Sequence, residues 1–186
     1  MKLSVRKRSA KQKSELTTIR RNGDVPAVLY SKGKDGQALA VDGREFDTAR
    51  RSIPSGHLPT TQFELHDADG SVRKAVVKAI DYHPTTYQVL HLDLMELHAG
   101  AEVNVKVPIV LTGVADCVGV KVGGVPRQVI RHLLVRCKPE HIPACLELDI
   151  RTLALKQSKR LSEIELPATV TPLVDMDEVA IVIAKR

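Results

Sequence analysis

Residues 6–30, RKRSAKQKSELTTIRRNGDVPAVLY, decide how this chain of 186 residues is organised. The beginning is strongly basic, because the first 21 residues carry eight Lys or Arg against a single Glu. A turn at residues 23–26 follows, and residues 27–30 are typical of a strand that enters a core. We therefore predict a cationic arm that is joined directly to a folded body.

A cationic arm suits a polyanion, because each Lys or Arg that neutralises a phosphate releases condensed counterions. Basic N-terminal segments are also often solvated tails, so charge alone leaves both interpretations open. The net charge of +6 is unevenly distributed, with 16 basic against 11 acidic residues in residues 1–95 and 12 against 11 in residues 96–186. This asymmetry favours one polyanion-binding half joined to a half with another role.

Several function classes find no support in the sequence. Cys117, Cys137 and Cys145 form no CxxC pair, which counts against a structural zinc site, and an odd number counts against a secreted disulfide framework. The cytosol is then the default compartment. No phosphate-binding glycine motif and no apolar run of membrane-spanning length is present, so we expect no cofactor, no metal and no membrane association.

The first half alternates strand-like runs with one helix signal. Asp42 is a candidate N-cap, and Glu45 stands at the spacing of a capping box, which predicts a helix over residues 43–53. An Asp-Gly pair at residues 69–70 predicts a β-hairpin. The predicted strands cover residues 27–30, 38–41, 62–66, 71–80 and 89–97.

The segment VLHLDLMEL at residues 89–97 carries a polar pair on an apolar strand. Alternate leucines share one face, so His91 and Asp93 share the opposite face. This pair is either aimed at a ligand or part of an ordinary solvated strand face. A catalytic role is weakly supported, because no nucleophile accompanies the pair.

The second half is β in character. Residues 98–101 break the strand pattern and form the predicted domain boundary, after which residues 103–111 alternate over a full strand. Residues 112–124 are expected to be a flexible β loop with a short valine alternation inside it. Further strands are predicted over residues 128–135, 146–150 and 179–183, which together indicate a second all-β domain.

These motifs resemble a known family, that of the bacterial large-subunit ribosomal protein number twenty-five. The resemblance in the first half rests on the runs RRNGDVPAVLY, AVVKAIDYHP and VLHLDL, which occur in the family's order. The second half resembles the long, two-domain form known as the general stress protein CTC type. That resemblance rests on EVNVKVPIVLTG, VGVKVGGVPRQV, KPEHIPACLELDI and DMDEVAIVI.

The resemblance implies a mainly β protein without enzymatic activity. It implies an N-terminal six-stranded β-barrel with short helices, residues 1–97, which binds 5S rRNA largely through the minor groove. A C-terminal mostly β domain of less defined role follows, residues 98–186. The protein would be a cytoplasmic, structural constituent of the large ribosomal subunit, monomeric when free, and in contact with neighbouring ribosomal proteins on the ribosome.

The resemblance also assigns RNA-binding residues by position. The basic residues up to Arg21 are expected to hold phosphates, while the exposed pair and the tyrosine near it read 2′-hydroxyls and base edges. Lys78 lies on a strand that approaches the same RNA. Either Arg8 or Lys11 matches one arginine of the family. Fewer phosphate contacts are expected from the arm, because Leu16, Thr17 and Thr18 stand where many members are basic. The expected residues are Arg8, Lys11, Lys13, Arg20, Arg21, Tyr30, Lys78, His91 and Asp93.

Three other functions compete with this one. A stress-linked RNA-binding protein would use its C-terminal domain to recruit a protein partner, and that domain would then bind the partner without RNA. An enzyme would hold His91 and Asp93 in a closed pocket, whereas an RNA-binding protein would expose them on a convex basic surface. A membrane-surface protein would need an amphipathic helix with a wide apolar face, which the sequence lacks.

Overall fold

The computed structural model describes residues 1–9, 13–31, 35–67 and 69–185, with the side chain of residue 13 not included. The chain divides into two compact units, Met1–Ala101 and Glu102–Arg186, each of which is described by itself. No helix in the described part of the chain is long and apolar enough to span a bilayer. The sequence analysis divides the chain into an RNA-binding domain, residues 1–97, and a C-terminal domain, residues 98–186. These roles stay predictions.

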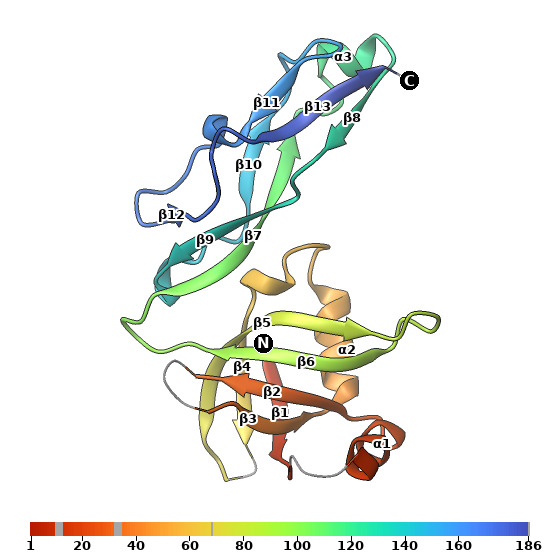
Figure 1. Ribbon diagram of the computed structural model, residues 1–186, viewed down its shortest axis with the longest axis vertical. Helices are drawn as coiled ribbons and strands as arrows, with labels where there is room; N and C mark the ends of the chain where they lie inside the picture. The colour runs from red at the N-terminus through yellow and green to blue at the C-terminus, as the bar shows by residue number, and fades with distance from the viewer. Residues whose placement is uncertain (10–12, 32–34, 68, 186) are drawn as a thin grey trace. The chain divides into compact units, whose positions relative to one another are not determined.

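The first unit is a closed six-stranded barrel (Figure 1), as the resemblance implies. Its strands follow the order β1-β3-β2-β6-β5-β4, and a parallel pair between β1 and β4 closes the cylinder. Leucine and valine side chains alternate inward along the strands and fill the interior. The strands are β1 (Lys2–Lys7), β2 (Val25–Tyr30), β3 (Gln37–Val41), β4 (Gln62–Asp67), β5 (Val72–Tyr82) and β6 (Val89–Glu96).

The prediction of a cationic arm is wrong, because the described part of the basic segment, residues 1–9 and 13–21, contains a strand and a helix of the first unit. Its beginning is β1, which buries Leu3 and Val5 and exposes the residues between them. Its end is the helix α1 (Lys13–Arg21), which leads into β2. Two apolar residues among so many charges make a weak alternation, and pairing with β3 and β4 decides the strand.

The helix α2 (Gly43–Ser52) agrees with its predicted position. The side chain of Asp42 accepts hydrogen bonds from the backbone N–H groups of Arg44 and Glu45, at 2.8 and 3.0 Å. The second half of the predicted capping box does not form, because the Glu45 carboxylate accepts from the backbone N–H and the hydroxyl of Ser4 instead. Glu45 therefore ties α2 to β1.

An irregularity in β5 sets which of its side chains face solvent. The register with β6 shifts between Val77 and Ala79, which is the signature of a β-bulge. Val77 is buried, and the two residues that follow it, Lys78 and Ala79, are both exposed. Alternation alone places Lys78 outside next to the inward Val77, and the bulge keeps Ala79 outside as well and returns Ile80 to the core side.

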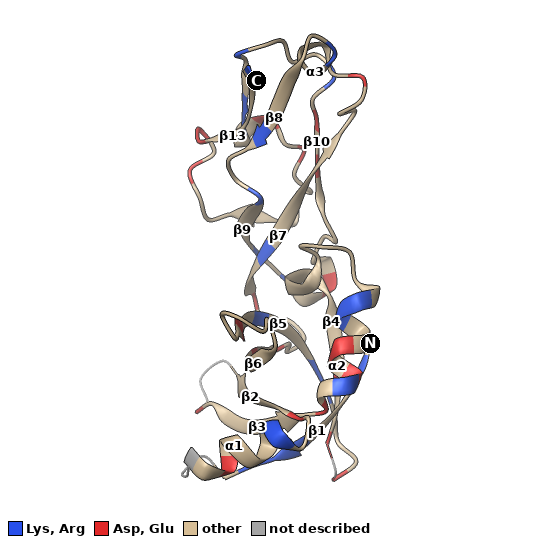
Figure 2. Cartoon of the chain, turned by 90° about the vertical axis from the view of Figure 1, so that its right-hand side faces the viewer, with Lys and Arg blue, Asp and Glu red and all other residues tan. Residues whose placement is uncertain are grey.

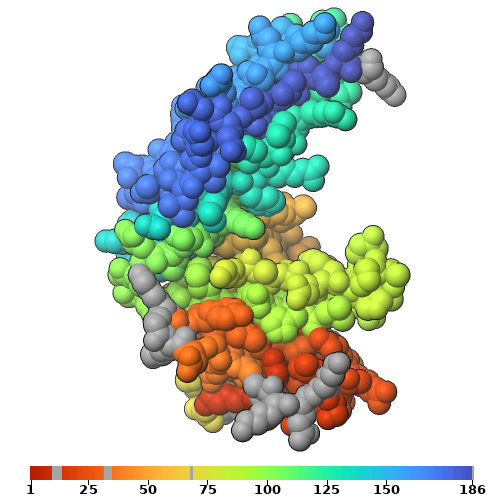
Figure 3. All heavy atoms as spheres, in the orientation of Figure 1, coloured from red at the N-terminus to blue at the C-terminus, as the bar shows by residue number. Residues whose placement is uncertain are grey.

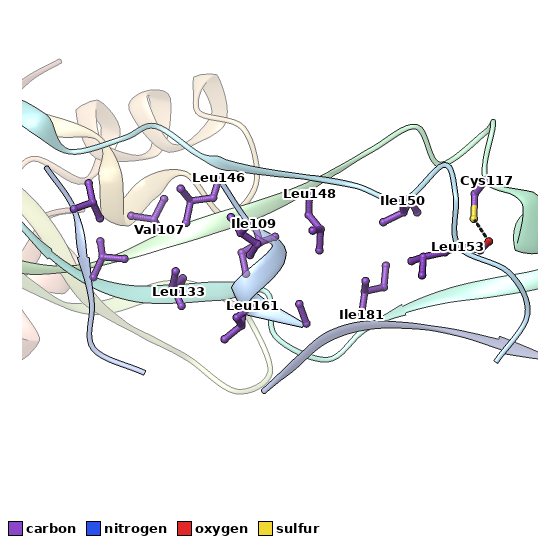
Figure 4. Close-up of a cluster of buried hydrophobic side chains, with 14 of the residues drawn as sticks. Val107, Ile109, Cys117, Leu133, Leu146, Leu148, Ile150, Leu153, Leu161 and Ile181 are labelled. Atoms are coloured by element: carbon purple, nitrogen blue, oxygen red, sulfur yellow. Dashed lines mark hydrogen bonds between the residues drawn. The ribbon is translucent and has the colours of Figure 1, made fainter. Parts of the chain in front are cut away.

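The second unit is built from two antiparallel or mixed sheets, in agreement with the expected β domain. One sheet has the order β10-β7-β9-β12 and the other β11-β13-β8. Aliphatic side chains from both sheets form one cluster, and Cys117 lies at its end, where its thiol donates to the Leu153 carbonyl (Figure 4). The strands are β7 (Val103–Thr112), β8 (Gly124–Gln128), β9 (His132–Cys137), β10 (Leu146–Asp149), β11 (Ser158–Arg160), β12 (Thr171–Pro172) and β13 (Val179–Lys185).

Two expectations for this unit are wrong. The predicted β loop over residues 112–124 contains a short helix, α3 (Val118–Lys121), and the predicted strand over residues 128–135 is divided between β8 and β9. Gly119 explains the helix, because its N–H donates to the Leu153 carbonyl and a Cβ there would lie 2.8 Å from Ile183. Packing against a distant segment thus overrides the valine alternation.

Candidate nucleic-acid interface

The outer face of the barrel strands β2, β6 and β5 carries the polar residues that the sequence singles out. Leu92 and Leu94 of β6 are fully buried, so His91 and Asp93 point outward, as the alternation predicts. Asp93 lies opposite Val28 of β2 on one side and Ala79 of β5 on the other. The pair therefore occupies the middle of a three-stranded convex surface.

His91 and Asp93 lie within ion-pair distance of each other. The His91 Nδ1 atom lies 3.2 Å from Asp93 Oδ1, and the two side chains are 25% and 32% exposed. A carboxylate only accepts hydrogen bonds, and an imidazole nitrogen that carries no proton accepts as well. The pair can therefore offer acceptors to solvent. RNA presents matching donors in its minor groove, namely 2′-hydroxyls and the guanine amino group.

Tyr30 and Lys78 flank the pair from the neighbouring strands. Tyr30 ends β2 with its side chain 41% exposed, and the Lys78 ammonium lies 5.6 Å from the centre of its ring. This is a cation–π contact across the outer face. A cation and an aromatic ring therefore stand beside the pair.

Arg20 reaches the same face from α1. Its Nε and Nη2 atoms donate to the Leu90 carbonyl at 3.2 and 3.0 Å. Leu90 immediately precedes His91, so the guanidinium is held against the backbone of β6 next to the pair. A guanidinium has five N–H groups, so three of them remain for other acceptors. Arg20 thus anchors α1 to β6 and still presents positive charge next to the pair.

The other predicted basic residues do not join this cluster. Arg8 is half-buried, and its Nε atom donates to the Leu39 carbonyl at 2.9 Å on the β3 side of the barrel. Arg21 is exposed in the last turn of α1. Lys13 begins α1, and its side chain lies outside the described residues, as does Lys11 entirely.

Acidic side chains of the first unit compensate part of the positive charge of the basic segment, and Figure 2 marks the charged residues along the chain. Arg6 forms an ion pair with Asp24, and Lys7 pairs with Asp69 and Asp67. The hydrogen bond to Asp69 and the charge of that residue raise the pKa of Lys7 above its ordinary value. The charge count of the segment therefore overstates the number of cations available to a polyanion.

A groove beside this face was not predicted from the sequence. It encloses about 370 Å³ between the end of α1, the start of α2 and the turn that joins β5 to β6. Arg20, Arg44, Arg50 and Tyr87 contribute to its walls. The helix predicted from the Asp42 cap contains Arg44 and Arg50, but nothing in its sequence indicates what they face.

Metal ligands do not gather in the described part of the chain. No group of three or more His, Cys, Asp or Glu side chains there is arranged to hold an ion. His91 and Asp93 are one such pair without a third partner.

Comparisons with known proteins cover both units. Residues 3–94 match the model of the Ribosomal L25p family, and residues 102–186 match the model described as ribosomal protein TL5, C-terminal domain. The chain is 45% identical to the large ribosomal subunit protein bL25 of Chlamydia abortus, 44% to that of Chlamydia muridarum and 42% to that of Chlamydia pneumoniae. Each alignment spans 186 residues and all of both chains.

These matches confirm the resemblance that the sequence motifs indicated. They join a barrel of the L25p type to a C-terminal domain of the TL5 type in one chain, in the order that the sequence predicted. They also confirm that the chain is not an enzyme, because the family is one of structural ribosomal proteins. With at least 42% identity over its whole length to several of its members, this chain belongs to the ribosomal L25p family, in the two-domain form that carries a TL5-type C-terminal domain.

Proposed function

We propose that this protein is a structural constituent of the large ribosomal subunit that binds 5S rRNA through the outer face of β2, β6 and β5. The observation that carries the proposal is the His91–Asp93 pair, which lies partly exposed on a convex barrel surface with Arg20, Tyr30 and Lys78 around it. Family membership supports the ribosomal setting, since the relatives carry the name large ribosomal subunit protein. The ribosome in turn accounts for a cytoplasmic location.

The two kinds of side chain have different roles in this proposal. Arg20 and Lys78 attract the phosphate backbone and supply salt-dependent affinity without sequence information. His91 and Asp93 accept hydrogen bonds from 2′-hydroxyls and from guanine amino groups in the wide minor groove of the RNA helix. A carboxylate beside an anionic helix is unfavourable unless the ligand donates to it, so Asp93 has a role in recognition.

Substitution of Asp93 tests the proposal, because charge and recognition predict opposite results. Asp93→Ala removes a negative charge, which by itself would strengthen binding to RNA. If Asp93 accepts hydrogen bonds from the RNA, the substitution instead weakens binding to 5S rRNA by about 1–3 kcal/mol, or roughly 5- to 150-fold. The affinity is measured by titration at a fixed salt concentration.

Asp81→Ala is the matched control. Asp81 lies on β5 opposite His91, is exposed and carries the same charge. Its removal should leave the affinity unchanged or raise it slightly. An Asp93→Ala variant that binds 5S rRNA as tightly as the parent chain would refute the recognition role. Equal binding of the parent to an unrelated duplex RNA would refute specific 5S rRNA binding as a whole.

The recruitment of a protein partner by the second unit, as in a stress-linked protein, stays a prediction. The match over residues 102–186 relates this unit to a domain of another ribosomal protein, TL5, and names no partner protein. A pull-down with residues 102–186 alone would not be a fair test until that unit is shown to fold by itself. The full chain, with and without ribonuclease treatment, is the appropriate bait.

A further inference from the structure

The groove between α1, α2 and the β5–β6 turn has a rigid floor. Gly23 follows α1 with a φ of +86°, and Gly43 begins α2. A Cβ atom on Gly43 would lie 2.1 Å from the Gly23 carbonyl oxygen, so the two backbones are in direct contact. The two helix ends therefore meet without side chains between them, which leaves the hollow above them open.

The walls of the groove carry more positive than negative charge. Arg20, Arg44 and Arg50 line it together with Asp24 and Asp47. Both acids are already paired, Asp24 with Arg6 and Asp47 with Arg50 at 3.2 Å. Arg20 is bound only to a backbone carbonyl, and Arg44 has no acidic partner in the described part of the chain. Positive charge therefore remains available inside the groove.

Arg50 has one guanidinium N–H group that no described residue accepts. Its Nε atom is buried and has no hydrogen-bond partner among the described residues. Buried polar groups are almost always hydrogen-bonded, and an orphaned guanidinium N–H requires an explanation. Because this Nε atom is buried, a ligand in the groove would meet Arg50 through the terminal nitrogens of its guanidinium, one of which lies 3.2 Å from Asp47.

The turn at the rim of the groove presents an aromatic ring. Tyr87 is 74% exposed and adopts a φ of +55°, which is uncommon for a bulky residue. His83 holds this conformation, because its carbonyl accepts from the Tyr87 N–H at 2.9 Å and its Nδ1 accepts from the backbone of Thr86 at 3.3 Å. The turn projects from the barrel surface (Figure 3), with Tyr87 both solvent-exposed and lining the groove.

We propose that this groove binds one unpaired nucleotide of RNA. Its phosphate would lie between Arg20, Arg44 and Arg50, and its base would stack on the ring of Tyr87. The volume of about 370 Å³ is at the lower end of small-ligand pockets, which suits a nucleotide and excludes a duplex. Base stacking on an exposed aromatic ring beside a basic groove is a general mode of single-strand binding. The groove extends the proposed function to a second site on the same unit.

The test is a titration of the full-length, ¹⁵N-labelled protein with single-stranded oligouridylate, followed by NMR. We expect shifts at the amides of Gly23, Gly43 and Tyr87. Arg44→Ala should weaken binding about tenfold, whereas Arg51→Ala should change it less than about twofold. Arg51 is a matched control because it lies on the same helix, is exposed and does not line the groove.

A second pair of variants separates stacking from folding. Tyr87→Asn removes the ring with a residue that tolerates positive φ, and it should lower the affinity for oligouridylate. Tyr87→Phe keeps the ring and should retain the affinity. Equal losses for Arg44→Ala and Arg51→Ala, or shifts confined to the strand face, would overturn the proposal, as would unchanged affinity in Tyr87→Asn.

The same variants distinguish this inference from the proposed function. If Asp93→Ala weakens 5S rRNA binding while Arg44→Ala and Tyr87→Asn bind oligouridylate as the parent does, the groove proposal fails and the strand face stands. If oligouridylate binds through Arg44 and Tyr87 while Asp93→Ala leaves 5S rRNA binding unchanged, the groove stands and the proposed recognition fails. Each site therefore has its own readout.

Discussion

The two units of this protein have similar interiors and different surfaces. Both bury aliphatic side chains from alternating strand positions. The barrel is closed, so it has no sheet edges, whereas the second unit consists of two open sheets. The barrel gathers an imidazole, a carboxylate, a lysine and a tyrosine on one face, while the exposed large side chains of the second unit include Val118, Val122, Val125 and Val129.

From this difference we expect recognition to be concentrated on the barrel, and overall charge is a poor guide to its position. The first unit carries 16 basic against 12 acidic residues and the second 12 against 10, so the excess is only slightly larger in the barrel. What distinguishes the barrel is that strand register places unlike polar groups side by side. We expect the functional contrast between the units to follow that placement.

The largest effect expected is on the barrel core. Phe63 is fully buried, and its ring centre lies 6.4 Å from that of Phe46. Phe63→Ala should lower the free energy of unfolding of the barrel by about 3–5 kcal/mol and reduce 5S rRNA binding near the melting temperature. Chemical denaturation, followed by NMR signals from each unit, measures the change.

Leu148→Ala in the second unit is the counterpart to Phe63→Ala. Leu148 is 1% exposed, so its truncation should destabilise by about 2–5 kcal/mol. RNA binding at low temperature should be unaffected, because the proposed contacts lie in the other unit. If Leu148→Ala reduced 5S rRNA affinity at a temperature where both units are folded, the functional contrast between the units would be broken.

The three cysteines, all in the second unit, provide a smaller test of its packing. Cys117 and Cys137 are buried and Cys145 is half-buried. Burial also raises the pKa of the Cys137 thiol, which keeps it neutral and unreactive. A thiol reagent should therefore modify Cys145 roughly a hundredfold faster than the other two, which respond only when the unit opens.

The burial of Cys137 also makes the stability of the second unit depend on pH. Because the folded state holds the Cys137 proton more tightly than the unfolded state, the second unit should lose stability as the pH rises past the ordinary pKa of a thiol. Mass spectrometry after timed labelling measures the rate at which the thiol reagent modifies each cysteine. Equal rates at all three cysteines under native conditions would show that the core of this unit opens freely, in contrast to its close packing.

Much of the barrel could be predicted from sequence, because local patterns and tertiary contacts agree there. The alternation in residues 89–97 placed His91 and Asp93 outward, and the cap at Asp42 fixed the start of α2. The first strand was missed because Leu3 and Val5 stand among charges. Their burial depends on pairing with β3 and β4, which follow much later in the chain.

The groove could not be predicted for a related reason. Arg20, Arg44 and Tyr87 come from three segments that only the folded barrel brings together. No local motif records that contact, and the close approach of Gly23 to Gly43 is visible only in the structure. Likewise, α3 depends on packing of Gly119 against Leu153 and Ile183. Sequence patterns identify strands and caps, while the neighbours of a loop come from the fold.

The smallest effect expected concerns the ion pairs of the basic segment. Asp69 accepts a hydrogen bond from Lys7, and this contact and the lysine charge lower the pKa of the Asp69 carboxyl. A carboxyl with a lowered pKa in the folded state adds stability above its unfolded pKa, and this stability is lost as the pH falls through the folded value. The melting temperature of Asp69→Asn should therefore be slightly below that of the parent at neutral pH and equal to it in strong acid.

Salt provides the control for this last effect, because both side chains are exposed and their attraction is screened. The difference between parent and Asp69→Asn should shrink at high ionic strength. A difference that persisted in strong acid and high salt would mean that Asp69 acts through the shape of the β4–β5 turn.

If the ion pair is instead confirmed, the charge of Lys7 is compensated by Asp69 within the first unit and is less available to RNA. Lys7→Met should then weaken 5S rRNA binding less than Arg20→Met, whose guanidinium has no acidic partner among the described residues.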